Sequence, residues 1–232
     1  MKVAKFARAI VVGSVLTPAI YVLVSTVSVA SKSMGLETSI VASALAQDKE
    51  RKTRRLPGIS EAMMKRLGVV TELTSPDTDK NPGAQPNFQK ALKELQDLEK
   101  YCAKKCNDYE KAQVFRFYAF AYYSLDNYSK AVESYRQVYL KSPNIPIAVE
   151  LDALNSLSQL SYAQEKYDDA LKYLSAWMEL STIVGADKYF LRGSINYSKG
   201  DKRRALDDIN TAISMRESNG KIAKEQWYNL QL

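Results

Sequence analysis

The 232 residues of this chain include no histidine and only two cysteines. The lack of histidine excludes catalytic triads, general bases and metal ligands built on imidazole, and two cysteines alone cannot complete a tetrahedral zinc site. The sequence also lacks a P-loop, a nucleophile elbow and a dinucleotide-binding fingerprint. We therefore expect no catalytic residues, no metal site, no cofactor and no enzymatic activity. Glycine and proline are scarce too, with nine and seven copies, which suits a helical chain.

Charge of one sign is not concentrated enough to predict nucleic-acid binding. The formal net charge is +7, from 33 basic and 26 acidic residues. One dense basic run, KERKTRR at 49–55, lies in a segment that we interpret as a linker over residues 47–58. Such a run is either a solvated tail or a patch for anionic lipid or an acidic partner.

The N-terminus has the residue order of a secretory signal. Lys2, Lys5 and Arg8 precede a mostly apolar run over residues 10–30. Cleavage can follow Ala30 or Ala46, but the run is also long enough to remain as a membrane anchor. The basic residues keep the N-terminus in the cytoplasm in both cases. We therefore expect residues 1–46 to be a signal peptide or an anchor, and the rest of the chain to be exported. An uncleaved run over 10–30 would hold the protein at the inner membrane.

Export places Cys102 and Cys106 in a compartment where disulfides form. Four residues apart, the two side chains share one face of a helix, and Asn107-Asp108 indicates that the helix ends there. A helix end can relax to accept a bridge, so the spacing predicts a disulfide. Two buried thiols are the alternative, and a redox-active pair is not expected because the spacing is not C-x-x-C.

Three stretches of the chain repeat one another, at 112–143, 151–182 and 186–217. In each, apolar residues recur at steps of three and four on both sides of a short turn, as in helices with one buried face. The second half of each stretch carries an alanine at the same place and a large residue four positions later; the alanines are Ala131, Ala170 and Ala205. The pattern predicts stacked helix–turn–helix pairs in an all-α solenoid.

The repeat resembles the tetratricopeptide repeat (TPR). The first unit matches its pattern with Phe115, Tyr118, Ala119, Tyr122, Ala131, Tyr135 and Pro143, and the third with Tyr189, Gly193, Gly200, Asp201, Ala205 and Ala212. The second unit matches less well, because Ser161 and Trp177 replace the usual Tyr and Ala. The resemblance implies a TPR-type helix–turn–helix solenoid, wound as a right-handed superhelix and preceded by the signal or anchor helix.

The remaining segments complete the domain organisation. Residues 59–109 are expected to form a divergent N-terminal helix pair, with helices at 59–73 and 87–105 and a long loop at 75–86 that is rich in Pro, Asp and Asn. A TPR array follows over 110–232, with a partial repeat from 224. Half a repeat cannot bury its apolar face, so we expect a longer array, or else a short cap.

Stacked pairs of this type present a concave inner face on which partners usually bind. The TPR register implies that this face is lined by Arg116, Phe120, Tyr123, Asn155, Gln159, Tyr162, Phe190, Ser194 and Tyr197. The tyrosines recur at one place in all three units, where they suit either an extended peptide or packing between repeats. Arg116 and Asn155 are polar where a packing residue would be apolar, so they are better candidates to hold a carboxylate or a peptide backbone.

Three stretches extend the resemblance beyond the repeat itself. RKTRRLPGISEAMMKRL at 51–67, the stretch 106–135 and the restart at Trp227-Tyr228 are together similar to periplasmic TPR proteins encoded beside TonB energy-transduction systems of Gram-negative bacteria. This resemblance implies a periplasmic scaffold that is accessory to TonB-dependent iron or siderophore uptake, with TonB, ExbB or ExbD as partners. A TPR scaffold in envelope assembly, cell-wall coordination or secretion is the alternative.

Overall fold

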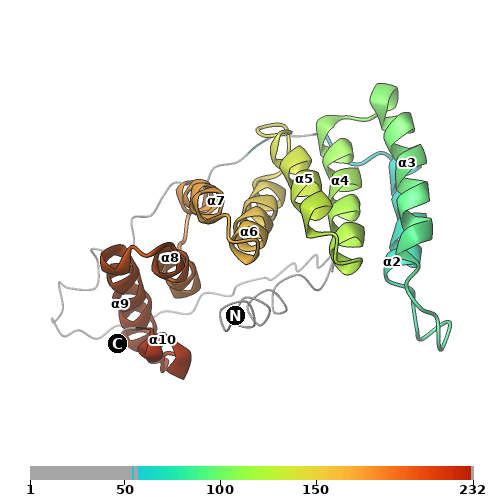
Figure 1. Cartoon of the computed structure of the whole chain (residues 1–232). Helices are drawn as coiled ribbons and strands as arrows, with labels where there is room; N and C mark the ends of the chain where they lie inside the picture. Colours follow the sequence, from blue (N-terminus) through green and yellow to red (C-terminus); the bar gives the residue numbers. More distant parts are fainter. Residues whose placement is uncertain (1–53, 55–56, 231–232) are drawn as a thin grey trace, which may run out of the picture. The chain divides into compact units, whose positions relative to one another are not determined.

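The structure is a computed structural model that describes residue 54 and residues 57–230. The expected signal or anchor over 1–46 and most of the basic linker lie outside this range. Within the range the chain folds into helices and contains no strand (Figure 1), and the helices are α2 (Glu61–Thr74), α3 (Phe88–Lys105), α4 (Asp108–Ser124), α5 (Tyr128–Tyr139), α6 (Ile147–Ala163), α7 (Tyr167–Leu180), α8 (Ala186–Lys199), α9 (Lys202–Ser218) and α10 (Glu225–Asn229).

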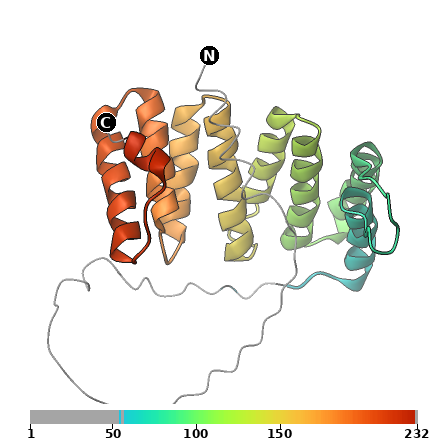
Figure 2. The same ribbon diagram turned by 90° about the horizontal axis from the view of Figure 1, so that it is seen from below.

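Consecutive helices pack against each other along the described chain. The most extensive contacts join α4 to α5, α6 to α7 and α8 to α9, so these helices form three pairs. Smaller contacts join each pair to the next, through α5 with α6 and α7 with α8. Figures 1 and 2 show the helices following one another in sequence order. The prediction of an all-helical chain whose successive helices stack is confirmed for this range.

The same backbone turn closes all three pairs. At equivalent places Asp126, Glu165 and Gly200 adopt the left-handed conformation, with φ of 56°, 61° and 94°. The residue after each of them donates its backbone N–H to a carbonyl five residues back, at 2.8, 2.9 and 2.9 Å. This is the bond of a helix C-terminus that ends in a left-handed residue. The turn therefore repeats although its sequence does not.

Small residues let the two helices of a pair approach closely. Ala131, Ala170 and Ala205, which the repeat pattern singled out, are all buried. The facing first helices carry Ala119, Ser158 and Gly193 at equivalent places, also buried. A Cβ on Gly193 would lie 2.8 Å from Cγ1 of Ile209, so the α8–α9 contact requires glycine there.

The first two helices build their own core with α4. Met63, Leu67 and Val70 of α2 pack against Leu95 and Leu98 of α3. α2 begins at Glu61, two residues later than the periodicity suggested, because the Ser60 side chain accepts a hydrogen bond from the Met63 N–H and caps the helix. At the end of α3 the structure contains a Cys102–Cys106 disulfide, with Cα atoms 4.5 Å apart.

α10 closes the described part of the chain. It is a short helix whose Trp227 is buried among Ile209, Ala212 and Ile213 of α9. The partial repeat expected from residue 224 thus covers apolar surface of the third pair, and Trp227 is its fully buried aromatic side chain.

Candidate functional site

The first helices of the three pairs, α4, α6 and α8, carry the residues that the sequence predicts for partner binding. Arg116 of α4 donates from Nη2 to Oδ2 of Asp152 on α6, at 3.0 Å, and from Nη1 to Oε1 of Gln113, at 3.1 Å. The Arg116 and Asp152 side chains stay 33% and 44% exposed. The pair therefore joins two successive helix pairs and remains accessible to solvent.

A second polar link joins α6 to α8. Oδ1 of Asn155 accepts hydrogen bonds from Nζ of Lys188 and, at 3.5 Å, from Nε2 of Gln159. The Lys188 ammonium also lies 4.5 Å from the centre of the Trp177 ring on α7, a cation–π distance. Burial lowers the pKa of Lys188, and the nearby Asp187 charge opposes that shift. An amide and an aromatic face thus solvate a half-buried cation between three helices.

The three equivalent tyrosines have different surroundings. Tyr162 lies 3.0 Å from the Ser198 hydroxyl and donates to the Ser194 carbonyl at 3.4 Å, so it joins α6 to α8. Burial raises the pKa of Tyr162, and the Ser198 hydrogen bond partly offsets this. Tyr123 packs edge-on against Tyr128 within its own pair, whereas Tyr197 is exposed. Among the three, Tyr197 offers the most surface to a partner.

The other predicted residues make packing contacts. Phe120 meets Phe88 of α3 edge to face, with ring centres 5.7 Å apart, and Phe190 stacks on Trp227 of α10 at 4.6 Å. Ser194 is buried and donates to the Phe190 carbonyl at 2.8 Å, and Gln159 is buried as well. Arg116, Asn155 and Tyr197 therefore remain the most available for contact with another molecule.

The repeat register did not indicate Asp152 and Lys188. Asp152 precedes Asn155 by three residues, which places both on one face of α6, so a search one turn along the helix could have found it. Lys188 reaches Asn155 from another helix pair, 33 residues away. No local pattern marks a contact at that separation.

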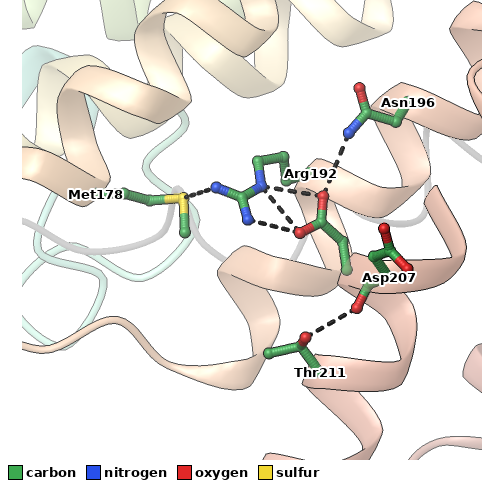
Figure 3. A network of polar contacts seen from close by, with 6 residues as sticks. Met178, Arg192, Asn196, Asp207 and Thr211 are labelled. Atoms are coloured by element: carbon green, nitrogen blue, oxygen red, sulfur yellow. Dashed lines mark hydrogen bonds and ion pairs between the residues drawn. The ribbon is translucent and has the colours of Figure 1, made fainter. Parts of the chain in front are cut away.

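A denser polar network lies between α8 and α9 (Figure 3), and the repeat register did not indicate it either. Arg192 of α8 donates from Nε and Nη2 to the Asp208 carboxylate of α9, with a shortest distance of 2.6 Å, and from Nη1 to the Met178 sulfur of α7 at 3.5 Å. Asn196 donates to the same carboxylate at 3.2 Å. Asp208 raises the pKa of Arg192. The Asp208 side chain is only 9% exposed, so this network joins helices rather than offering a surface.

The described residues provide neither a metal-binding cluster nor a membrane-spanning helix. No three cysteine, aspartate or glutamate side chains in residue 54 and residues 57–230 gather in a way that could hold a metal ion. In the same range no helix combines the length and the apolar character needed to cross a bilayer.

No protein-family model matches the chain, and no characterised protein is significantly similar to it.

Proposed function

We propose that this chain is a TPR-type scaffold that binds another protein through the first helices of its pairs, α4, α6 and α8. The observation that carries the proposal is the Arg116–Asp152 ion pair at the junction of two helix pairs. A solvent-exposed pair of this kind adds little to stability. Its charges keep unused hydrogen-bonding capacity, which a peptide backbone or a charged side chain can engage.

Equivalent features of the three pairs support the assignment to the TPR type. Each pair has a left-handed residue at the same turn position. Each also sets a buried alanine of its second helix against a buried small residue of its first. A right-handed superhelix with a concave binding face belongs to this proposal, because stacked repeats of one geometry accumulate a constant rotation.

The resemblance at 51–67 and 106–135 supports a more specific role. It favours a periplasmic location and an accessory part in TonB-dependent iron or siderophore uptake. The partners would then be TonB, ExbB or ExbD, and the run over 10–30 would hold the scaffold at the inner membrane if it is not cleaved.

The proposal is tested by recovering partners from membranes. Tagged, exported full-length protein is crosslinked mildly, purified and analysed by mass spectrometry, in parallel with the Arg116→Glu variant. Arg116→Glu places a carboxylate beside Asp152 and should repel a partner that depends on this pair. Arg203→Glu is the matched control, because Arg203 is an exposed arginine on α9.

Recovery of TonB, ExbB or ExbD with wild type and Arg203→Glu, but not with Arg116→Glu, would support both the pathway and the binding face. Recovery of envelope-assembly, cell-wall or secretion proteins would retain the scaffold and overturn the uptake role. Equal recovery of every partner by all three proteins would overturn the proposed face.

A further inference from the structure

Arg54 lies far from α6 in sequence but contacts its N-terminal end. Nη1 of Arg54 donates to Oε2 of Glu150 at 2.5 Å and to the Ile145 carbonyl at 3.0 Å. Ser142 donates its hydroxyl to the other carboxylate oxygen of Glu150 at 2.9 Å. A guanidinium, a carboxylate, a carbonyl and a hydroxyl thus meet between the end of α5 and the start of α6.

Glu150 is well suited to hold a cation. Its side chain is 8% exposed, and a buried carboxylate is costly unless it is paired and hydrogen-bonded. It also lies in the first turn of α6, where the helix dipole favours a negative charge. Without Arg54 the carboxylate would keep only the Ser142 hydrogen bond among these contacts. The site therefore favours a cation.

Residues 58–60, which follow Arg54 along the chain, contact α4 through uncharged hydrogen-bonding groups. Ser60 donates its backbone N–H and its hydroxyl to Oε1 of Glu110 at 2.8 and 2.6 Å, and Asn107 donates to the Gly58 carbonyl at 3.1 Å. Glu110 is buried in the first turn of α4, as Glu150 is in that of α6. Glu110 of α4 and Glu150 of α6, each in the first turn of its helix, thus bind residues that precede α2. Of these contacts, the one made by Arg54 is charged.

We propose that Ser142, Ile145 and Glu150 form an exchangeable binding site for the arginine side chain of a basic peptide, and that the chain's own Arg54 occupies this site in cis. Both contacts leave from one guanidinium nitrogen, and the Arg54 side chain keeps 21% of its surface exposed. A guanidinium has five N–H donors, so the site holds only its tip. Such a contact can open locally without unfolding the helices that form the site.

The chemistry of the site indicates which basic side chain binds it better. Both contacts come from the single nitrogen Nη1, so arginine differs from lysine here through its hydration. A guanidinium is more weakly hydrated than an ammonium and is therefore less costly to bring to a buried carboxylate. Peptides that compete with Arg54 should therefore bind better through arginine than through lysine. Arg54, which belongs to the basic run KERKTRR at 49–55, is then the cis ligand of this site.

The probe is a labelled synthetic peptide with the sequence of residues 53–60, TRRLPGIS. Its binding to the full-length chain is followed by fluorescence anisotropy. Wild type, Arg54→Ala and Arg54→Ala with Glu150→Gln are compared, and a second peptide carries lysine in place of Arg54. Glu133→Gln, an exposed glutamate on α5, serves as the matched control in the Arg54→Ala background.

Arg54→Ala should bind the arginine peptide more tightly than wild type, in which the cis arginine competes. Glu150→Gln should weaken that binding by about 30-fold or more, because it removes one partner of a buried charge pair. The lysine peptide should bind more weakly and Glu133→Gln should have no effect. Equal binding with and without Glu150, or no saturable binding to Arg54→Ala, would overturn the proposal.

Circular dichroism shows whether each variant remains folded. Arg54→Lys retains the charge and provides a second variant if Arg54→Ala unfolds. It should bind the arginine peptide more tightly than wild type, because lysine is a weaker cis competitor. Binding no tighter than that of wild type would overturn the proposal, and none of these outcomes depends on the partner recovered from membranes.

Discussion

Arg192 and Asp208 form a two-pronged ion pair that joins α8 to α9, and Asp208 is almost completely buried. Asn196 shares the same carboxylate, and Met178 of α7 contacts the far side of the guanidinium. A carboxylate in this setting depends on its cation, because removing one partner leaves an uncompensated buried charge.

We expect Arg192→Ala to lower the free energy of unfolding by about 3–5 kcal/mol, measured by urea denaturation. The control is Arg204→Ala, which removes an exposed arginine paired with Asp201 and should cost no more than about 0.5 kcal/mol. Similar losses for the two variants would show that burial of Asp208 does not determine the effect.

Replacing Gly193 and Gly68 with alanine should change the stability of the protein in opposite directions. Both lie within helices, where alanine has the higher propensity by about 1 kcal/mol. A Cβ at Gly68 meets open space, so Gly68→Ala should stabilise. At Gly193 it would lie 2.8 Å from Ile209 and 3.0 Å from the Ala205 carbonyl, and overpacking of this kind costs about 1–3 kcal/mol. Thermal unfolding should show a higher Tm for Gly68→Ala and a lower one for Gly193→Ala, and a gain at both positions would contradict the close α8–α9 contact.

Stability should fall in acid partly through Glu110. Burial raises the pKa of this carboxyl, but hydrogen bonds from Ser60 and from the Asn107 backbone outweigh burial and leave the pKa below its ordinary value of 4.5. A folded-state pKa below the unfolded one contributes stability that is present above the unfolded value and is lost as the pH falls through the folded one.

Urea denaturation between pH 7 and pH 3 measures this contribution. Glu110→Gln should be less stable than wild type at neutral pH, and the difference should shrink below about pH 4. Glu61→Gln is the control, because Glu61 is exposed in a pair with Lys65. A difference that does not change with pH would mean that Glu110 acts by packing alone.

The Cys102–Cys106 disulfide predicts a simple result with a thiol probe. Protein that is purified and denatured without reductant should not be labelled, and it should take up two labels after reduction. The loop that the bridge closes is short, so its reduction should cost only about 2 kcal/mol of stability. Labelling before reduction would show that the protein carries free thiols.

The helices and their pairing were predictable because they depend on local features. Periodicity located helices near 59–73 and 87–105, and α2 and α3 begin and end within two residues of those limits. The alanines at 131, 170 and 205 indicated where helices approach closely, and all three are buried. The turn was harder to predict, because Asp126, Glu165 and Gly200 share a backbone conformation rather than a residue type.

The candidate face was predicted only as a set of register positions. Register treats Phe190 and Arg116 alike, yet Phe190 stacks on Trp227 while Arg116 pairs with Asp152 in contact with solvent. Which positions pack and which stay accessible depends on neighbouring helices, and no single repeat contains that information.

Residue spacing was enough to predict the helical class, the repeat unit and the small residues at helix contacts, because each of them follows from positions within about forty residues of one another. Which polar side chains meet depends instead on how the helices stack in three dimensions. Arg54 pairs with Glu150, 96 residues away, and Lys188 donates to Asn155, 33 residues away. Such pairs form where the stacked helices bring side chains together, and the cost of leaving a buried charge unpaired then selects the partner.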